Sequence, residues 1–392
     1  MTRARVAAAL TVLALALGAC SAPADEQSDG RAAADDANGT LLADPTDLPV
    51  FPSLQRLSSQ AVKIRYKSTS GVDGSATTVS GIVLVPTGDP PDGGWRIASL
   101  GHPTTGLASS CAPSGYPGLM GNAGVIGAFL TYGYLVVMTD YQGLGTPGPH
   151  PYLEPKTAAH NVIDAVRAAR NVVPEASTSW VGYGVSQGGQ AVWAANELMP
   201  DYGAGLDLAG SISIVPPTDL RPLVDAMVDG TLTVEQRVLM PTILSGLKVA
   251  HPDLRIEDYL HGVMLRRLDA FLTCENENSD ERGRIAQNAP AADFQPSSPE
   301  AADRLRAILG ESVLPSRRAS APMLVAYGDE DRVVLPRWTA EAVTLACGLG
   351  DVVETVVASG QGHGQLNLGS IPADWTRARF AGLPPTDTCA PA

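Results

Sequence analysis

Short apolar runs alternate with longer helical patterns through the middle of the chain. Strand-like runs lie at residues 97–100, 135–139 and 180–183, and segments of helical periodicity lie at 121–132 and 156–172. Parallel strands are joined by crossover helices, so this alternation predicts a parallel sheet. Two antiparallel edge strands are predicted before it, at 62–66 and 79–85. Together these patterns predict an α/β fold with a mostly parallel, doubly wound sheet.

The pattern changes after a short apolar run at residues 210–215. From about residue 218 to 310 the segments are mainly helical and interrupted by charges, and strand patterns return only at 322–327 and 352–357. Helices inserted between two strands predict a helical cap on the sheet domain. We expect residues 51–392 to form one domain that includes this cap.

The N-terminus has the pattern of an export signal. Arg3 and Arg5 precede an apolar run at residues 6–17, which is too short to span a membrane because a spanning helix needs about 20 residues. Leu17-Gly18-Ala19-Cys20 resembles the bacterial lipobox, in which the cysteine becomes the lipid-carrying N-terminus. We therefore expect a lipoprotein signal peptide at 1–19 and a lipid on Cys20; the alternative is an ordinary secretory signal.

Residues 20–50 are rich in Ala, Asp, Ser and Gly and are predicted to be a flexible tether to the membrane. The formal net charge of the whole chain is −14, which makes nucleic acid an unfavourable partner. The same charge argues against electrostatic docking on anionic lipid, so membrane attachment is expected from the anchor alone. The expected location is outside the cytoplasm, anchored to the cell membrane or secreted.

The chain has five cysteines: Cys20, Cys111, Cys274, Cys347 and Cys389. If Cys20 is acylated, an even number remains in an exported protein, which favours two disulfides in any of three pairings. Their spacings match no zinc-ligand pattern, and CxxC is absent, so neither a metal site nor thiol redox chemistry is expected.

A candidate nucleophile lies in Gly184-Val185-Ser186-Gln187-Gly188, between the strand at 180–183 and a helical segment at 191–198. Small residues flanking a strand-to-helix turn allow a serine to adopt a strained conformation and point outward. The following helix N-terminus stabilises negative charge on a substrate oxygen, and the Gln187 amide is the expected donor.

A serine hydroxyl needs a histidine base that a carboxylate orients, and after such a turn the expected chain order is serine, acid, histidine. Asp331 is the predicted acid, because it follows the strand at 322–327 and best fits Gly-x-x-Asp with apolar residues after it; Asp329 and Glu330 compete. Of the six histidines only His363 follows Asp331, in a glycine-rich loop at 359–364, so it is the predicted base.

A second donor to the substrate oxygen is expected from the loop after the strand at 97–100, which reads Gly101-His102-Pro103-Thr104-Thr105-Gly106. Pro103 has no amide hydrogen, so the donor is either Thr104 or Thr105.

Several stretches, taken together and in order, resemble the secretory lipase family, which includes the fungal lipase A enzymes. They are the loop at 102–106, Cys111-Ala112-Pro113-Ser114, Asp140-Tyr141-Gln142-Gly143, His150-Pro151-Tyr152-Leu153, the serine turn, and the Asp331 and His363 loops. The resemblance implies an α/β-hydrolase fold with a helical cap, disulfides Cys111–Cys274 and Cys347–Cys389, and no cofactor. It also implies hydrolysis of acylglycerols and other carboxylic esters through an acyl-enzyme.

Two features of the cap bear on the substrate. Residues 255–281 are dense in Arg, Asp and Glu, unlike a surface that enters a lipid phase, so soluble or short-chain esters are as plausible as long-chain ones. Residues 234–249 either line an acyl pocket or form cap core. Two alternative functions stay open: peptidase or acyltransferase chemistry on the same three residues, and a non-catalytic surface binding protein.

Overall fold

The computed structural model describes residues 1–2, 38–364 and 366–389. Most of the expected signal peptide, Cys20 and most of the expected tether lie outside these ranges. The chain divides into two units, Met1–Asp36 and Ala37–Ala392, and the architecture below is that of the second unit. Within the described part of the chain, no helix combines the length and the apolar character needed to cross a membrane.

A nine-stranded sheet forms the centre of the domain, in the order β1-β2-β3-β5-β4-β6-β7-β8-β9. The first strands pair antiparallel and every pair from β5 to β9 is parallel, as predicted. The strands are β1 Thr46–Asp47, β2 Ser58–Thr69, β3 Ala76–Pro86, β4 Trp95–Gly101, β5 Leu135–Thr139, β6 Ala176–Val185, β7 Asp207–Ile214, β8 Met323–Gly328 and β9 Val353–Ala358.

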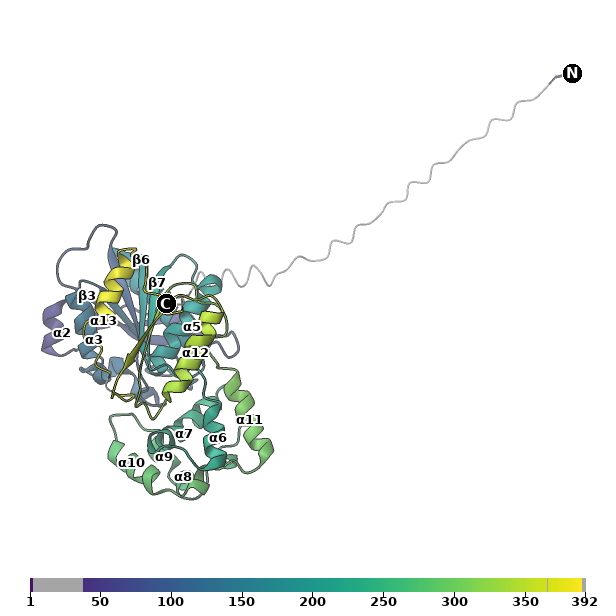
Figure 1. Cartoon of the computed structure of the whole chain (residues 1–392). Coiled ribbons are helices and arrows are strands. Elements are labelled where there is room, and N and C mark those ends of the chain that lie inside the picture. Colours follow the sequence, from purple (N-terminus) through teal and green to yellow (C-terminus); the bar gives the residue numbers. More distant parts are fainter. Residues whose placement is uncertain (3–37, 365, 390–392) are drawn as a thin grey trace. The chain divides into compact units, whose positions relative to one another are not determined.

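Helices cover both faces of the sheet (Figure 1). Val136 and Val137 of β5 point to opposite faces because side chains alternate along a strand, and they belong to two different hydrophobic clusters. The cluster of Val137 includes α4 Pro155–Val172, α5 Gln187–Tyr202 and α12 Pro336–Gly348; that of Val136 includes α2 Pro52–Leu57, α3 Ala123–Thr131 and α13 Ile371–Phe380. The predicted doubly wound, mostly parallel α/β architecture is thus confirmed.

Six α-helices lie between β7 and β8, and we call the segment that contains them the helical insertion. They are α6 Pro222–Asp229, α7 Val234–Leu247, α8 Gly262–Arg266, α9 Leu268–Phe271, α10 Ser279–Asn288 and α11 Pro299–Gly310. Figure 1 shows them grouped at one end of the strands. They share a hydrophobic cluster of their own, which Tyr152, Leu153 and Trp338 of the sheet domain also join.

Residues 38–50, which the composition assigns to the tether, pack onto the domain. β1 pairs with β2, and Leu48 and Val50 are buried. The Asn38 side chain is also buried and donates through Nδ2 to Tyr202 Oη at 2.7 Å. One short strand and a few buried side chains anchor a segment whose overall composition is that of a linker.

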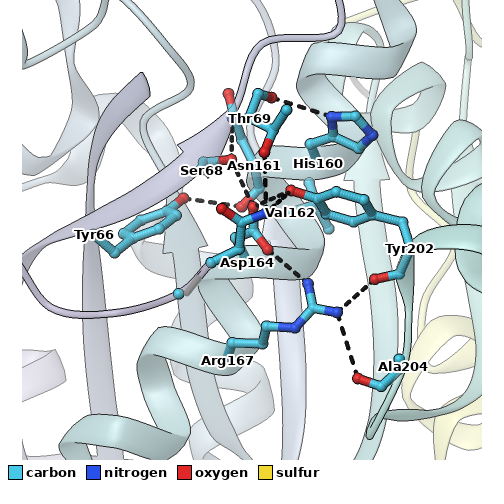
Figure 2. A network of polar contacts seen from close by, with 12 residues as sticks. Tyr66, Ser68, Thr69, His160, Asn161, Val162, Asp164, Arg167, Tyr202 and Ala204 are labelled. Carbon is cyan, nitrogen blue, oxygen red and sulfur yellow. Dashed lines mark hydrogen bonds and ion pairs between the residues drawn. The ribbon is translucent and has the colours of Figure 1, made fainter. Parts of the chain in front are cut away.

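Tyr202 belongs to a buried polar network around Asp164 of α4 (Figure 2). The Asp164 carboxylate accepts hydrogen bonds from Ser68 Oγ, Tyr202 Oη and Arg167 Nη1, each at 2.7 Å. Burial raises the pKa of Asp164 to about 6, although Arg167 and the hydroxyl donors act in the opposite direction. The network joins β2, α4 and α5.

Two disulfides cross-link the described part of the chain, Cys111–Cys274 and Cys347–Cys389. These are the pairs that the resemblance implies. The first joins the segment after β4 to the helical insertion. The second joins α12 to the C-terminal segment, where Thr388 donates its amide to Val353 O at the start of β9.

Candidate active site

Ser186 occupies a strained turn between β6 and α5. Its backbone has φ 54° and ψ −117°, a region that L-residues rarely adopt. The turn is possible because its flanking glycines have no side chain: a Cβ on Gly184 would lie 2.0 Å from Gly188 O, and one on Gly188 would lie 1.9 Å from Gly101 O. The Ser186 amide donates to Ile214 O at 2.8 Å, which fixes the turn on β7.

His363 and Asp331 reach Ser186 from neighbouring loops. His363 Nε2 lies 2.8 Å from Ser186 Oγ, and His363 Nδ1 lies 2.7 Å from Asp331 Oδ2. Because an ionised carboxylate only accepts, Nδ1 carries the proton and Nε2 is free to accept from the serine hydroxyl. All three follow the carboxyl ends of parallel strands, β6, β8 and β9, the edge where α/β sheets place their sites.

The three acids of the loop after β8 lie in different environments. Asp331 is 3% exposed, and its Oδ1 accepts from the amides of Val333 and Val334 at 2.8 and 3.0 Å. Asp329 instead accepts from the Gly360 amide at 2.6 Å and from Ser359 Oγ at 3.0 Å, at the start of the His363 loop. Only Asp331 of the three has a hydrogen bond to His363 in the described structure.

The candidate oxyanion donors lie beside this turn. Gln187 is the first residue of α5, and the close approach of Gly101 to Gly188 brings the loop at 101–106 against the helix N-terminus. Thr104 Oγ1 lies 2.6 Å from Tyr152 Oη, and Thr105 O accepts from the Glu275 amide at 2.9 Å. Thr104 and Thr105 therefore both remain candidates for the second oxyanion donor.

Sequence reasoning gave no role to His150 and Tyr152, which contact both groups of donors. His150 Nε2 lies 2.9 Å from the Gln187 side-chain nitrogen. No local periodicity could reveal this contact, because 37 residues separate the partners. The only signal was the place of His150-Pro151-Tyr152-Leu153 among the stretches that carry the family resemblance.

An apolar pocket adjoins Ser186. Its walls come from the sheet domain and from α6 and α7, and include Leu153, Leu220, Leu223, Leu239 and Ile243. The cavity volume is about 20 Å³, room for one or two water molecules. Within residues 234–249, Leu239 and Ile243 line this pocket, while Leu244 is buried in the core of the insertion.

A larger cleft of about 470 Å³ lies between α4, α5, α7 and the end of α11, and Ser186 is not among its lining residues. Tyr152 lines both spaces. Across residues 38–364 and 366–389, no cluster of three or more His, Cys, Asp or Glu side chains has the arrangement of a metal site.

The model of the secretory lipase family matches residues 121–270, which include the serine turn and helices α6 to α8 of the helical insertion. The resemblance to the secretory lipase family is confirmed. A comparison with curated protein sequences found no match.

Solved structures resemble the whole domain. Candida antarctica lipase A in its closed state has a TM-score of 0.71 at 17% identity, over 91% of this chain and 85% of that chain. The rice cell wall degrading esterase LipA from Xanthomonas oryzae, in a ligand-bound form, has a TM-score of 0.66 at 21% identity, over 88% of this chain and 95% of that chain. At these identities the likeness establishes the shared fold.

Proposed function

We propose that this protein is a serine carboxylic-ester hydrolase, a lipase or esterase, that uses Ser186, His363 and Asp331. The observation that carries the proposal is the continuous hydrogen-bonded series from Ser186 Oγ through His363 to Asp331 at a strained turn. The family match and the lipase and esterase named among the structural relatives support ester hydrolysis over other chemistry on the same three residues.

In the proposed mechanism Ser186 Oγ attacks the ester carbonyl carbon while His363 Nε2 takes the serine proton. The carbonyl oxygen becomes an oxyanion, which the Gln187 amide and an amide of Thr104 or Thr105 stabilise. The carbon–alkoxy bond then breaks, the alcohol leaves with the proton from His363, and Ser186 carries the acyl group. Water attacks this acyl-enzyme, again with His363 as base, and releases the acid and free serine.

The pocket beside Ser186 supports an apolar acyl group as the part of the substrate that enters it. Its volume is small, so we expect short acyl chains to be hydrolysed faster than long ones unless α6 and α7 move apart.

Hydrolysis of p-nitrophenyl esters from acetate to palmitate tests this function. The wild-type chain should hydrolyse at least the short esters, and Ser186→Ala and His363→Ala should each lose at least about 1,000-fold in kcat. His251→Ala is the matched control, because His251 lies in the larger cleft, paired with Glu311, and should retain activity. Failure of the wild-type chain to hydrolyse any of these esters would refute the function.

We also propose that the protein is exported and anchored through a lipid on Cys20. The two disulfides support an oxidising compartment. Expressed in a bacterium, the wild-type chain should incorporate labelled palmitate and partition into detergent. Cys20→Ser should do neither; a wild-type chain without label would favour an ordinary secretory signal.

A further inference from the structure

His150 is held as a hydrogen-bond acceptor behind the serine turn. It is 4% exposed, and its Nδ1 lies 2.8 Å from the carbonyl oxygen of Gln142. Since a carbonyl only accepts, Nδ1 bears the hydrogen and Nε2 presents a lone pair. The side-chain amide of Gln187 donates to that lone pair at 2.9 Å.

The surroundings of His150 keep it in this state. Burial lowers the pKa of the imidazole to about 4, so the ring is neutral at pH 7 and Nε2 stays an acceptor. The Gln142 amide is itself fixed to α4 by Asn161 Oδ1 at 2.8 Å. The ring stacks on Tyr141, with centroids 6.0 Å apart and planes at 19°.

Tyr152, two residues after His150, contacts the loop at 101–106 on the other side of the site. Its hydroxyl lies 2.6 Å from Thr104 Oγ1, and the ring is 3% exposed. Leu153 follows with φ 60°, a conformation that costs free energy in a leucine and is kept only where the surrounding packing enforces it. The short segment 150–153 therefore has a fixed shape between the serine turn and the loop at 101–106.

We propose that His150 and Tyr152 are positioning residues of the oxyanion hole, His150 through Gln187 and Tyr152 through Thr104. This inference rests on the proposed function, since it needs an oxyanion at Ser186. Donors stabilise an oxyanion only at about 2.7–3.1 Å, and a displacement of about 1 Å can cost 100-fold in rate. Gln187 begins a helix, where its amide has no intrahelical partner, and Thr104 lies in an irregular loop, so a side-chain contact adds a restraint to each.

The test uses His150→Phe, which keeps a ring and removes the polar contacts with Gln187 and Gln142, and Tyr152→Phe, which removes only the hydroxyl. We expect each to lower kcat about 10- to 100-fold with KM within about 3-fold. Phenylboronic acid, whose adduct with serine is a tetrahedral anion, should bind more weakly by the same factor in a titration that does not depend on turnover. His150→Gln should restore most of the loss, because its side-chain oxygen can accept from Gln187.

Two further variants make the result specific. Tyr202→Phe also removes a buried hydroxyl, but from the Asp164 network, so kcat and boronate affinity should not change. Thr104→Val combined with Tyr152→Phe should lose no more than the larger single loss, because Tyr152 is proposed to act through the Thr104 hydroxyl.

The inference is wrong if His150→Phe and Tyr152→Phe keep wild-type boronate affinity. It is also wrong if their losses follow a fall in melting temperature and His150→Gln gives no rescue, since the residues would then be merely structural. Either result leaves the proposed function standing as long as the wild-type chain hydrolyses esters and Ser186→Ala does not. A wild-type chain that neither hydrolyses esters nor binds the boronate overturns both.

Discussion

At the residue scale, Asp331 has a geometry that its two acidic neighbours lack. The amides of Val333 and Val334 fix one carboxylate oxygen, which turns the other toward His363 Nδ1. A carboxylate held by two amides and an imidazole has little freedom to rotate, so it keeps the histidine in one tautomer. Asp329 instead accepts a hydrogen bond from the backbone of the His363 loop, so it helps to position the loop but does not orient the imidazole.

This difference predicts unequal effects for two matched substitutions. Asp331→Asn should lower kcat by about 1,000- to 10,000-fold, because an amide donor toward Nδ1 selects the wrong histidine tautomer. Asp329→Asn should lower it less than about 10-fold, since an amide oxygen can still accept from Gly360. Steady-state kinetics on one short ester compares them, and equal losses would argue against Asp331 as the orienting acid.

Asp164 supplies a second prediction, on stability. A carboxyl with a folded pKa of about 6 binds its proton more tightly in the native chain than in the unfolded one, where it is 3.8. Its contribution to the free energy of unfolding is therefore fully present below about pH 4 and is lost as pH rises through about 6. The size is about 3 kcal/mol at most, since one pKa unit corresponds to about 1.4 kcal/mol.

Asp164→Asn should remove this dependence while it keeps the side-chain shape. The free energy of unfolding of the variant, relative to wild type, should rise between pH 4 and pH 7. Urea unfolding at pH 4, 5, 6 and 7 measures it, with the exposed Asp89→Asn as control. Parallel profiles for wild type and Asp164→Asn would contradict the raised pKa.

At the element scale, the sequence predicts the strands and turns that depend on local pattern. β5 and β8 are buried at every position, so each appears as an uninterrupted apolar run, and the serine turn follows from two glycines and a strand. Composition assigns residues 38–50 to the tether because an average over the segment hides a few buried side chains. The Tyr152–Thr104 and Asp164–Ser68 contacts, 48 and 96 residues apart, have no counterpart in any local pattern.

Two helical glycines give a prediction about α5 and α10. Gly188→Ala would place Cβ 1.9 Å from the backbone oxygen of Gly101, the last residue of β4, so α5 and the loop at 101–106 must separate. We expect a loss of about 1–3 kcal/mol in stability and at least about 100-fold in kcat.

Gly283→Ala in α10 is the matched control, because its Cβ would meet nothing within 4 Å. It should add about 0.5–1 kcal/mol through helix propensity and leave kcat unchanged. Urea unfolding measures the stability of both variants, and ester kinetics measure their kcat. Full activity in Gly188→Ala would contradict the close packing of the site.

At the scale of the whole molecule, Tyr152 and Leu153 of the sheet domain belong to the hydrophobic cluster of the helical insertion, and both also line the pocket beside Ser186. The Cys111–Cys274 disulfide cross-links the insertion to the segment after β4, and it lies close to the candidate oxyanion loop. A Cβ on Gly106 would be 2.6 Å from Cys111 Sγ, and the Glu275 amide donates to Thr105 O. The second disulfide lies near the start of β9, whereas His363 follows the other end of that strand.

The two disulfides should therefore differ in their effect on activity more than on stability. Chain entropy over separations of 163 and 42 residues gives contributions of about 5 and about 4 kcal/mol. The double variant Cys111→Ala with Cys274→Ala should also lose kcat, because the insertion and the loop at 101–106 are no longer joined. Cys347→Ala with Cys389→Ala should keep kcat at temperatures where it remains folded. Melting curves and ester kinetics on both pairs separate the two effects, and equal kcat values would mean that hydrogen bonds alone, such as that of Glu275, hold the insertion against the site.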